Sequence, residues 1–409
     1  MWLLHTAAIK LEEFHGSVPP YAILSHTWSN NEVSFQEMLS VPVGEIEDEY
    51  RYQKIRMFCR LAKQYGFEYC WIDNVCIDKR SSAELSEAIN SMYSWYREAK
   101  LCIIYFVDVP PKSDEAGITQ EEAFRNSRWF TRGWTLQELI APKTRLFFAN
   151  DWSLIENSIC GSAGGDIVDL ISSITRITPL VLRDHSKLQT TCVAERMSWA
   201  AKRQTTRPED AAYSLMGIFS VNMAILYGEG LRSAFWRLQN EIMQTSFDQT
   251  IFSWKGPYES SGLLAHTPDD FADLPALKLW KPDYLSTFSM TNMGLQIQPF
   301  IYNIPVESNN DPSSQSQDPL IVYAALQCST KTERGWDIMF VQLKRVEDVF
   351  CTMNGLRCKA YRRVNCQELD MFTSVNLAGR KSEVLLVLED KHNDLIRMSI
   401  ESHWENAHE

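Results

Sequence analysis

Apolar, strand-like runs alternate with helix-like stripes over the first 150 residues of the chain. The runs cover residues 21–26, 67–72, 101–107 and 144–148. Between them, apolar residues recur at helical spacing over 53–65, after the capping pattern Ser81-x-x-Glu84, and over 134–140. Strands separated by helices form a parallel sheet that helices cover on both faces. The sequence therefore predicts an α/β domain over residues 1–150.

Polar side chains stand at the carboxyl ends of these runs. Ser25 and His26 close the first run, Asp73 follows the second and Asp108 follows the third. Ligands of open parallel sheets bind beyond the carboxyl ends of the strands. Ser25 and His26 are therefore candidates to contact ribose or phosphate. The alternative for His26 is a ring satisfied by backbone groups, and the alternative for Asp73, as a ribose ligand, is a helix cap.

The segment 132–138 places an arginine, a tryptophan and a glutamate close together. In a helix, Trp134 and Glu138 lie one turn apart on the same face. A carboxyl beside a large aromatic surface loses water, which raises its pKa towards a range useful in catalysis. Arg132 fits bidentate phosphate binding. The alternative is that Trp134 packs in the core while Arg132 pairs with Glu138 or Asp73.

Other residues carry weaker signals. Trp28 is a candidate pocket wall or a core residue, and Asp78 joins Asp73 near the second strand end without a third metal ligand at clear spacing. Cys76 with His26 has the composition of a nucleophile pair, but Cys76 lies in an apolar stretch. Glu84 is interpreted as a capping residue. We therefore predict no metal site.

Two further regions follow, and each has its own pattern of predicted secondary structure. Helical patterns dominate 151–248, after a linker-like glycine-rich stretch at 160–165. Short strand-like runs dominate 249–409, and we expect an antiparallel β-domain, either a sandwich or an open barrel. The runs lie at 250–254, 294–299, 320–326, 337–343 and 383–388, and the polar stretch 307–318 is predicted to be a mobile loop.

Charge and cysteine usage exclude several function classes. The formal net charge is -12 and the basic clusters are short, which argues against nucleic acid and anionic membranes as partners. The 10 cysteines form no CxxC pair. No apolar run approaches the ~18 residues of a membrane span, and the start lacks the features of a secretory signal. We expect a reduced, cytoplasmic protein.

Three blocks resemble the signature blocks of the fungal heterokaryon incompatibility (HET) domain. They are YAILSHTW at 21–28, WIDNVCID at 71–78 and RGWTLQE at 132–138. The runs RQTTRPEDAAY at 203–213 and YGEG at 227–230 resemble the helical region that often follows this domain. The resemblance implies a fungal protein of non-self recognition, innate immunity and programmed cell death.

A second, more distant resemblance is to Toll/interleukin-1 receptor (TIR) domains, with a flavodoxin-like parallel sheet. It rests on the strand 101–107, Asn126-Ser127-Arg128-Trp129, the Trp134-x-x-x-Glu138-Leu139 helix and the strand 144–148. In TIR domains that cleave NAD, the glutamate of this helix is catalytic, which implies Glu138 here. The resemblance also implies NAD or a related nucleotide as substrate, no bound cofactor, and self-association. Gly133 departs from the TIR spacing.

Three interpretations of function follow. The first is an NAD glycohydrolase in which Glu138 stabilises a ribosyl cation while Ser25, His26, Asp73 and Arg132 position the dinucleotide and Trp134 walls the nicotinamide. The second is a non-enzymatic signalling module with the same cleft. The third is a small-molecule enzyme that uses the same pocket.

Overall fold

The computed structural model describes residues 1–29, 31–40, 49–112, 118–155, 166–279, 287–302, 320–333, 335–353, 356–373 and 382–390. The chain divides into two compact units. Unit 1 holds Met1–Thr190 with Lys202–Leu231, and unit 2 holds Thr191–Ala201 with Arg232–Glu409. The predicted linker at 160–165 and the predicted loop at 307–318 lie outside the described residues. The boundaries at 150 and 248 stay predictions.

Unit 1 is built on a six-stranded sheet with a parallel centre. Its order is β2 (Lys10–Glu13), β1 (Trp2–His5), β4 (Tyr69–Trp71), β3 (Tyr21–His26), β5 (Leu101–Tyr105) and β6 (Arg145–Phe148). The pairs β4–β3, β3–β5 and β5–β6 are parallel, while β1 pairs antiparallel with both β2 and β4. The predicted parallel sheet is confirmed. The antiparallel edge hairpin was not predicted, because β2 is mostly exposed and lacks an apolar run.

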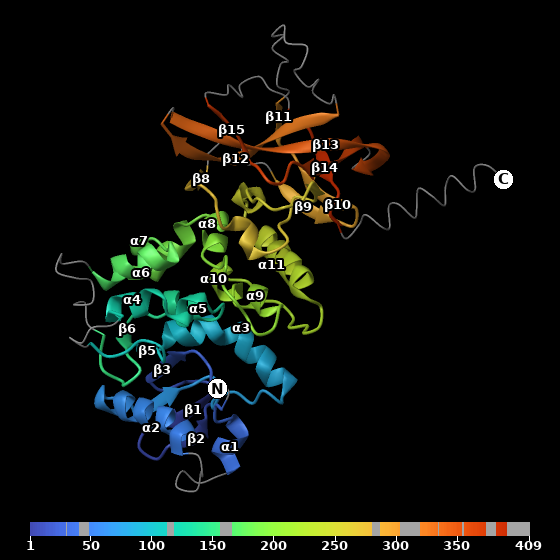
Figure 1. Ribbon diagram of the computed structural model, residues 1–409. Helices are drawn as coiled ribbons and strands as arrows, with labels where there is room; N and C mark the ends of the chain where they lie inside the picture. The colour runs from blue at the N-terminus through green and yellow to red at the C-terminus, as the bar shows by residue number, and fades with distance from the viewer. Residues whose placement is uncertain are drawn as a thin grey trace. The chain divides into compact units, whose positions relative to one another are not determined.

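Helices cover both faces of this sheet. The helix α2 (Glu49–Gln64) contacts β3 and β4, and α5 (Thr135–Ile140) contacts β3. Figure 1 shows α2 on one face, and α3 (Ser82–Glu98), α4 (Gln120–Arg125) and α5 on the other. Ser81 caps α3 by accepting the Glu84 N–H, as its sequence pattern predicts. Gly66 follows α2 with φ +87°, a left-handed conformation that suits glycine at a helix end.

The remaining helical elements are short. In unit 1 they are α1 (Phe35–Ser40), η1 (Arg128–Thr131), α6 (Ile167–Thr175), α7 (Pro179–Arg183), η3 (His185–Thr190), α9 (Asp210–Tyr213) and α10 (Met216–Phe219). In unit 2 they are α8 (Val193–Ser198), α11 (Leu231–Thr245, whose first residue belongs to unit 1), η4 (Gln249–Phe252) and η5 (Pro268–Phe271). These elements bear out the helical texture predicted between 166 and 246.

Unit 2 is dominated by a mostly antiparallel sheet. The path runs β11 (Phe300–Tyr302), β12 (Ile321–Thr332), β13 (Gly335–Met353), β14 (Leu356–Val364), β16 (Leu385–Val387), β10 (Gly294–Ile297) and β9 (Phe288–Thr291). Off this path, β15 (Asp370–Thr373) pairs with β13, β7 (Ser260–Ser261) with β14 and β8 (Leu277–Leu279) with β12. Among the described strand pairs of this second sheet, only β14–β16 is parallel. The β-rich character predicted from the sequence is confirmed.

One predicted strand is wrong. Residues 250–254 belong to the 3-10 helix η4 and the turn after it. Asp248 caps this helix by accepting the Thr250 N–H at 2.9 Å, and the apolar side chains Ile251, Phe252 and Trp254 are buried all the same. The short apolar run therefore predicted burial correctly, whereas the capping aspartate before it favours a helical backbone conformation over a strand.

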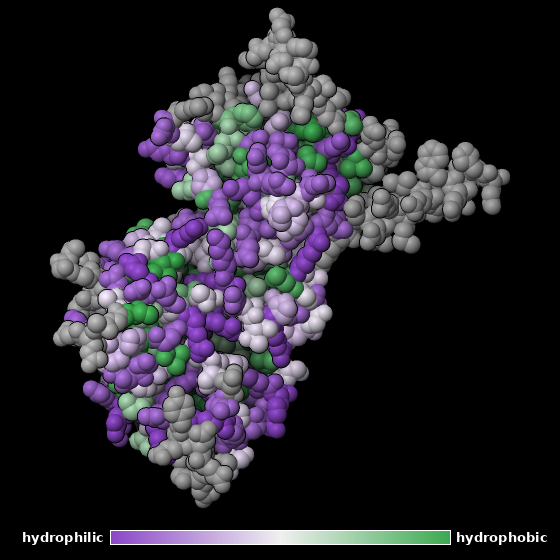
Figure 2. Space-filling view, viewed as in Figure 1, coloured by the Kyte–Doolittle hydropathy of each residue, from purple (hydrophilic) through white to green (hydrophobic). Residues whose placement is uncertain are grey.

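Figure 2 shows a face dominated by hydrophilic residues, with hydrophobic ones in small separate groups. No helix in the described ranges combines the length and the apolar character of a membrane span.

Candidate functional site

A cavity of about 230 Å³ opens in unit 1 at the carboxyl ends of β3 and β4. This is the edge at which open parallel sheets bind ligands. Its walls come from the segments that follow β3 and β4, from α3, from the start of α5 and from residues 206–227. The lining side chains that the argument uses are His26, Trp28, Asp73, Lys79, Tyr96, Arg132, Trp134, Glu138, Arg207, Asp210 and Tyr227.

Glu138 reaches the cavity from α5 and is only 9% exposed. Ser25 Oγ donates to Glu138 Oε2 at 2.5 Å and accepts from Trp129 Nε1 at 2.9 Å. The indole N–H can only donate, so the serine proton is directed at the carboxyl. Burial, with help from the charge of Asp73, raises the pKa of Glu138 to about 8 against hydrogen bonds from Ser25 and Tyr96. Glu138 is therefore mostly neutral at pH 7.

Asp73 is in the opposite state. His26 Nε2 lies 3.1 Å from Asp73 Oδ1, and Trp28 Nε1 donates to Asp73 Oδ2 at 2.8 Å. Burial raises the pKa of Asp73, but the charge of Lys79 and the bonds from His26 and Trp28 outweigh it and hold the pKa at about 2. Two carboxyls whose pKa values are pushed apart are a common arrangement of acid and base groups in active sites.

A hydrogen-bond chain sets the tautomer of His26. Lys54 Nζ lies 3.0 Å from His26 Nδ1 and donates to Glu32 Oε1 at 2.5 Å. An ammonium can only donate, so Nδ1 accepts and the ring proton sits on Nε2, facing Asp73. The imidazole is thereby held by polar side chains at both nitrogens, and not by backbone groups.

Two cation–aromatic pairs line the cavity nearer solvent. Lys79 Nζ lies 3.5 Å from the centroid of the Trp28 ring, and Trp28 is 48% exposed. Arg207 Cζ lies 3.8 Å from the centroid of the Tyr227 ring. Cations over aromatic faces are held by the ring quadrupole. The mouth of the cavity thus combines aromatic faces with positive charge.

The segment 202–231 forms one wall of the cavity, and its shape depends on hydrogen bonds from two glycine N–H groups to one carboxylate. The carboxylate of Glu209 accepts the N–H groups of Gly228 at 2.8 Å and Gly230 at 3.0 Å. Both glycines have positive φ, +100° and +77°, which side chains rarely adopt. Tyr227 OH then donates to Asp210 Oδ1 at 3.0 Å. These hydrogen bonds join the runs 203–213 and 227–230, and Asp210 and Tyr227 both line the cavity.

The same segment lies beside the start of α5. Gly133 N–H donates to the Gln204 carbonyl at 2.9 Å, and Arg203 Nη1 donates to the Arg132 carbonyl at 2.9 Å. Arg132 Nη2 in turn donates to Thr206 Oγ1 at 3.0 Å. Among the described residues Arg132 forms no ion pair with Glu138 or Asp73, so its guanidinium stays available to an anion.

Comparisons with known proteins assign this part of the chain. Residues 21–123 match the family model described as heterokaryon incompatibility protein (HET). The chain carries a HET domain. Over 231 residues it is 43% identical to vegetative incompatibility protein HET-E-1 of Podospora anserina, an alignment that covers 56% of this chain and 16% of that relative. The aligned part of the chain therefore spans about a sixth of the length of that protein. Residues 233–331 match a domain of unknown function, and no solved structure matches the chain.

The HET domain and the segments next to it bring the predicted site residues together. His26, Trp28, Asp73, Arg132, Trp134 and Glu138 all line the cavity. Ser25 is fully buried and lies behind Glu138, outside the lining. Their chemical roles stay predictions.

Other candidates face elsewhere. Asp78 accepts hydrogen bonds from Gln36 Nε2 and from the Arg80 N–H, and Glu84 accepts the Asp78 N–H. Asp108 accepts from Ser127 Oγ at 2.7 Å. Cys76 is buried, and burial raises the pKa of its thiol. None of these four lines the cavity of the HET domain.

Five of the lining residues named above were missed by sequence reasoning: Lys79, Tyr96, Arg207, Asp210 and Tyr227. Tyr96 belongs to the apolar stripe of α3, which predicts a core position, and it is indeed 1% exposed. The run at 203–213 and the YGEG turn carried the only signal for Asp210 and Tyr227. Nothing local to Lys79 marks it, because its significance depends on the Trp28 ring 51 positions earlier.

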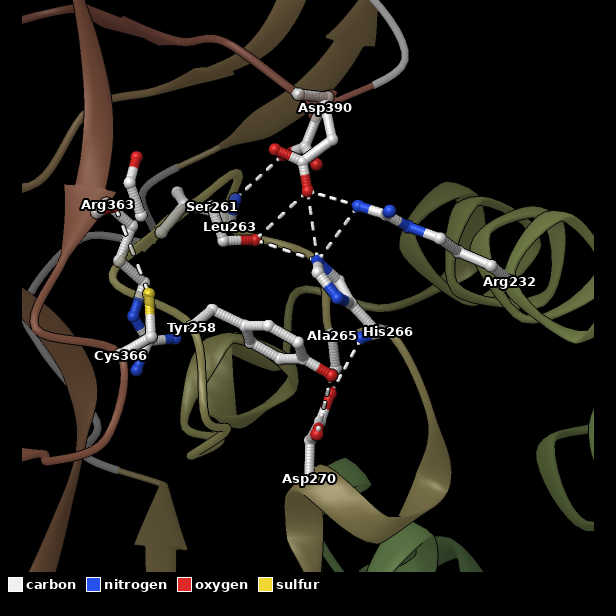
Figure 3. Close-up of polar contacts among 12 residues, drawn as sticks. Arg232, Tyr258, Ser261, Leu263, Ala265, His266, Asp270, Arg363, Cys366 and Asp390 are labelled. Carbon is white, nitrogen blue, oxygen red and sulfur yellow. Dashed lines mark hydrogen bonds and ion pairs between the residues drawn. The ribbon is translucent and has the colours of Figure 1, made fainter.

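A second polar cluster lies in unit 2. His266 Nε2 lies 3.0 Å from both Ser261 Oγ and Asp390 Oδ2, and Arg232 and Arg362 pair with Asp390. Figure 3 shows Arg232, Ser261 and His266 converging on Asp390. A serine hydrolase needs the carboxylate on the other ring nitrogen and an accessible hydroxyl. Here both groups meet one nitrogen and Ser261 is fully buried, so the cluster is structural.

Proposed function

We propose that this chain acts in heterokaryon incompatibility and that its HET domain is an NAD glycohydrolase of TIR-like design. Membership of the HET family and the likeness to HET-E-1 support the biological role. The strand order β4-β3-β5-β6 supports the TIR-like assignment, because in chain order it reads 2-1-3-4, as in flavodoxin-like sheets. The single observation that carries the activity is a nearly buried glutamate beside an ionised aspartate in one cavity.

The reaction would break the bond between the ribose C1′ and the nicotinamide nitrogen of NAD. The bonding electrons leave with nicotinamide, the ribose carries oxocarbenium character, and water adds at C1′ with loss of a proton. The Glu138 carboxylate would stabilise this cation in a site of low dielectric. Ser25 would act through Glu138, by directing its hydroxyl proton at Oε2.

The other cavity residues would hold the substrate. Asp73 and His26 lie at the strand ends where ribose hydroxyls fit, and Arg132 presents a guanidinium suited to phosphate. Trp134 and Trp28 offer aromatic walls for the base. Self-association, as the TIR resemblance implies, would make the activity depend on protein concentration.

Ionisation of Glu138 sets the expected pH dependence. The proposed role needs the carboxylate, whereas burial raises the pKa of Glu138 to about 8. Nicotinamide release should therefore rise with pH from 6, reach half of its maximum near pH 8 and level off above about pH 9.

The test is nicotinamide release from NAD by purified protein at several protein concentrations and pH values. Glu138→Gln keeps the shape and charge of the neutral acid but cannot ionise, so it should abolish release. Release that survives this substitution removes Glu138 from its role. Absence of release at every concentration, from a folded wild-type protein, supports a signalling module or another substrate instead.

A further inference from the structure

We propose that the corner formed by Trp28 and Asp73 is a binding site for an organic cation, such as the pyridinium ring of oxidised nicotinamide, and that Lys79 occupies this site in the empty protein. The inference rests on the proposed function for its choice of ligand. The inference differs from the proposed function because it concerns how a ligand is recognised and how Lys79 competes with it, and not how a bond is cleaved. Nothing in the sequence motifs assigns a role to Lys79.

The corner has the two parts that recognition of a cation requires. Trp28 Nε1 donates to Asp73 Oδ2 at 2.8 Å, which fixes the indole ring beside the carboxylate. Asp73 is ionised, and the ring is 48% exposed at the cavity mouth. An aromatic face next to a negative charge attracts flat or quaternary cations through the ring quadrupole and by direct charge attraction.

The position of Lys79 indicates that this corner binds positive charge. Its ammonium lies 3.5 Å from the Trp28 ring centroid, close enough to cover the face that a ligand ring would stack on. It acts electrostatically on Asp73, and its charge is the largest single influence that lowers the pKa of that carboxyl. The corner therefore already holds a positive charge, supplied by the chain itself.

This occupant is replaceable. Within the described part of the chain, Lys79 has no hydrogen bond and no ion pair, so the ring face and the charge of Asp73 hold it. Lys54 offers a contrast, because it is tied to both Glu32 and His26. Lys79 lies between β4 and α3, outside both elements, and its stem rotates about four bonds. A ligand cation can take its place without moving a helix or strand.

The two arginines of the cavity do not share this position. Arg132 donates to Thr206 Oγ1, and Arg207 lies over Tyr227. Their positive charge suits the phosphates of a dinucleotide. A ligand that carries a cationic ring and anionic phosphates therefore meets opposite charges in one cavity, and only the cationic end competes with Lys79.

Self-occupation lowers the apparent affinity, because only the fraction of molecules with a free corner binds. Lys79→Gln should therefore tighten binding of a cationic ligand, by about two- to sixfold if the lysine contact is as strong as cation–aromatic pairs at exposed sites. Trp28→Leu should weaken it by at least the same factor. Trp28 is about half exposed, so the protein is expected to stay folded, which a melting curve checks.

The experiment measures binding of 1-methylnicotinamide and of neutral nicotinamide by calorimetry, to wild type, Lys79→Gln, Trp28→Leu and the surface control Lys63→Gln. 1-Methylnicotinamide has no ribosyl bond, so its binding is independent of any cleavage. We expect the cation to bind more tightly than nicotinamide, more tightly still to Lys79→Gln, unchanged to Lys63→Gln and poorly to Trp28→Leu.

Equal affinity for the two ligands, or weaker binding of the cation to Lys79→Gln, overturns the inference. Weaker binding would mean that Lys79 contacts the ligand directly. If 1-methylnicotinamide behaves as expected while NAD is not cleaved, the inference stands and the proposed hydrolase activity fails. If NAD is cleaved while the two ligands bind alike, the activity stands and this inference fails.

Discussion

Each unit of the protein holds a buried glutamate beside an ionised aspartate. In unit 1 these are Glu138 and Asp73, and in unit 2 they are Glu389 and Asp390. Burial raises the pKa of Glu138 and of Glu389 to about 8, while charged neighbours and hydrogen bonds overcome burial and hold Asp73 and Asp390 at a pKa of about 2. Judged by protonation alone, the two pairs are alike.

The two pairs differ in how closely they are packed. Glu389 is 3% exposed and accepts the Leu263 N–H at 2.8 Å, and a Cβ placed on Gly262 would lie 2.1 Å from Glu389 Oε2. Asp390 is enclosed by Arg232, His266 and Arg362. Glu138 instead faces a cavity, and within the described residues the cations that line this cavity form no ion pair with a carboxylate. A raised carboxyl pKa therefore indicates burial, whereas a functional site also needs space for a ligand beside the carboxyl.

The matched pair of substitutions Glu138→Gln and Glu389→Gln should give the largest contrast. We expect nicotinamide release to fall at least about 100-fold in Glu138→Gln, because a carboxylate that stabilises the transition state is lost. Glu389→Gln should stay within about threefold of wild type per folded molecule, because the glutamine reproduces a neutral acid. Similar losses in both variants, at equal folded fractions by circular dichroism, would end the distinction drawn between the two pairs.

The closed packing around Glu389 predicts a large effect on stability. Gly262→Ala places its Cβ against the carboxyl of Glu389 and should lower the free energy of unfolding of unit 2 by about 3 kcal/mol, as overpacked cores do. Glu389→Ala removes the obstructing group, so the alanine at 262 should add little further loss in that background. Denaturant titration of the two single variants and the double variant measures this coupling, and simple additivity would contradict the packing argument.

Much of the fold could be predicted because its determinants are local. Continuous apolar runs located β3 and β5, and Ser81 marked the start of α3. The hairpin β1–β2 and the helix η4 were missed for different reasons. β2 is stabilised by pairing with β1 and not by an apolar pattern, and η4 follows from the cap at Asp248.

From the sequence, only the site residues at the ends of the parallel strands could be placed together. Parallel strands share one carboxyl edge, so the apolar pattern alone was enough to place His26 and Asp73 together. Lys79, Asp210 and Tyr227 come from connecting segments, and their position depends on contacts between residues far apart in the sequence. The placement of Ser25 behind Glu138 depends on the Trp129 N–H, a contact across 104 positions. Such contacts leave no local pattern.

The two raised glutamates also predict how stability changes with pH. Each is mostly protonated when folded below its pKa of about 8, whereas the unfolded carboxyl ionises near its ordinary value of 4.5. The folded state therefore binds more protons between these values, and stability falls as the pH rises from 5 to 8. Each Gln variant should remove part of this slope and gain on the order of 4 kcal/mol at pH 8, with little gain at pH 5. Melting temperatures across this range test it, and parallel curves for wild type and variants would contradict it.

The smallest effect concerns the hydrogen bond from Ser25 to Glu138. Loss of this donor removes an interaction that lowers the Glu138 pKa, so Ser25→Ala should move the midpoint of the pH–rate profile upwards and reduce release at pH 7 by about threefold. Ser261→Ala removes the equally buried serine of unit 2, which bonds His266 and not a glutamate, and should leave the midpoint in place. The midpoint is the decisive reading, because a merely loosened fold would lower the rate at every pH without moving it. A fall in rate with an unchanged midpoint would therefore mean that Ser25 supports packing and does not tune Glu138.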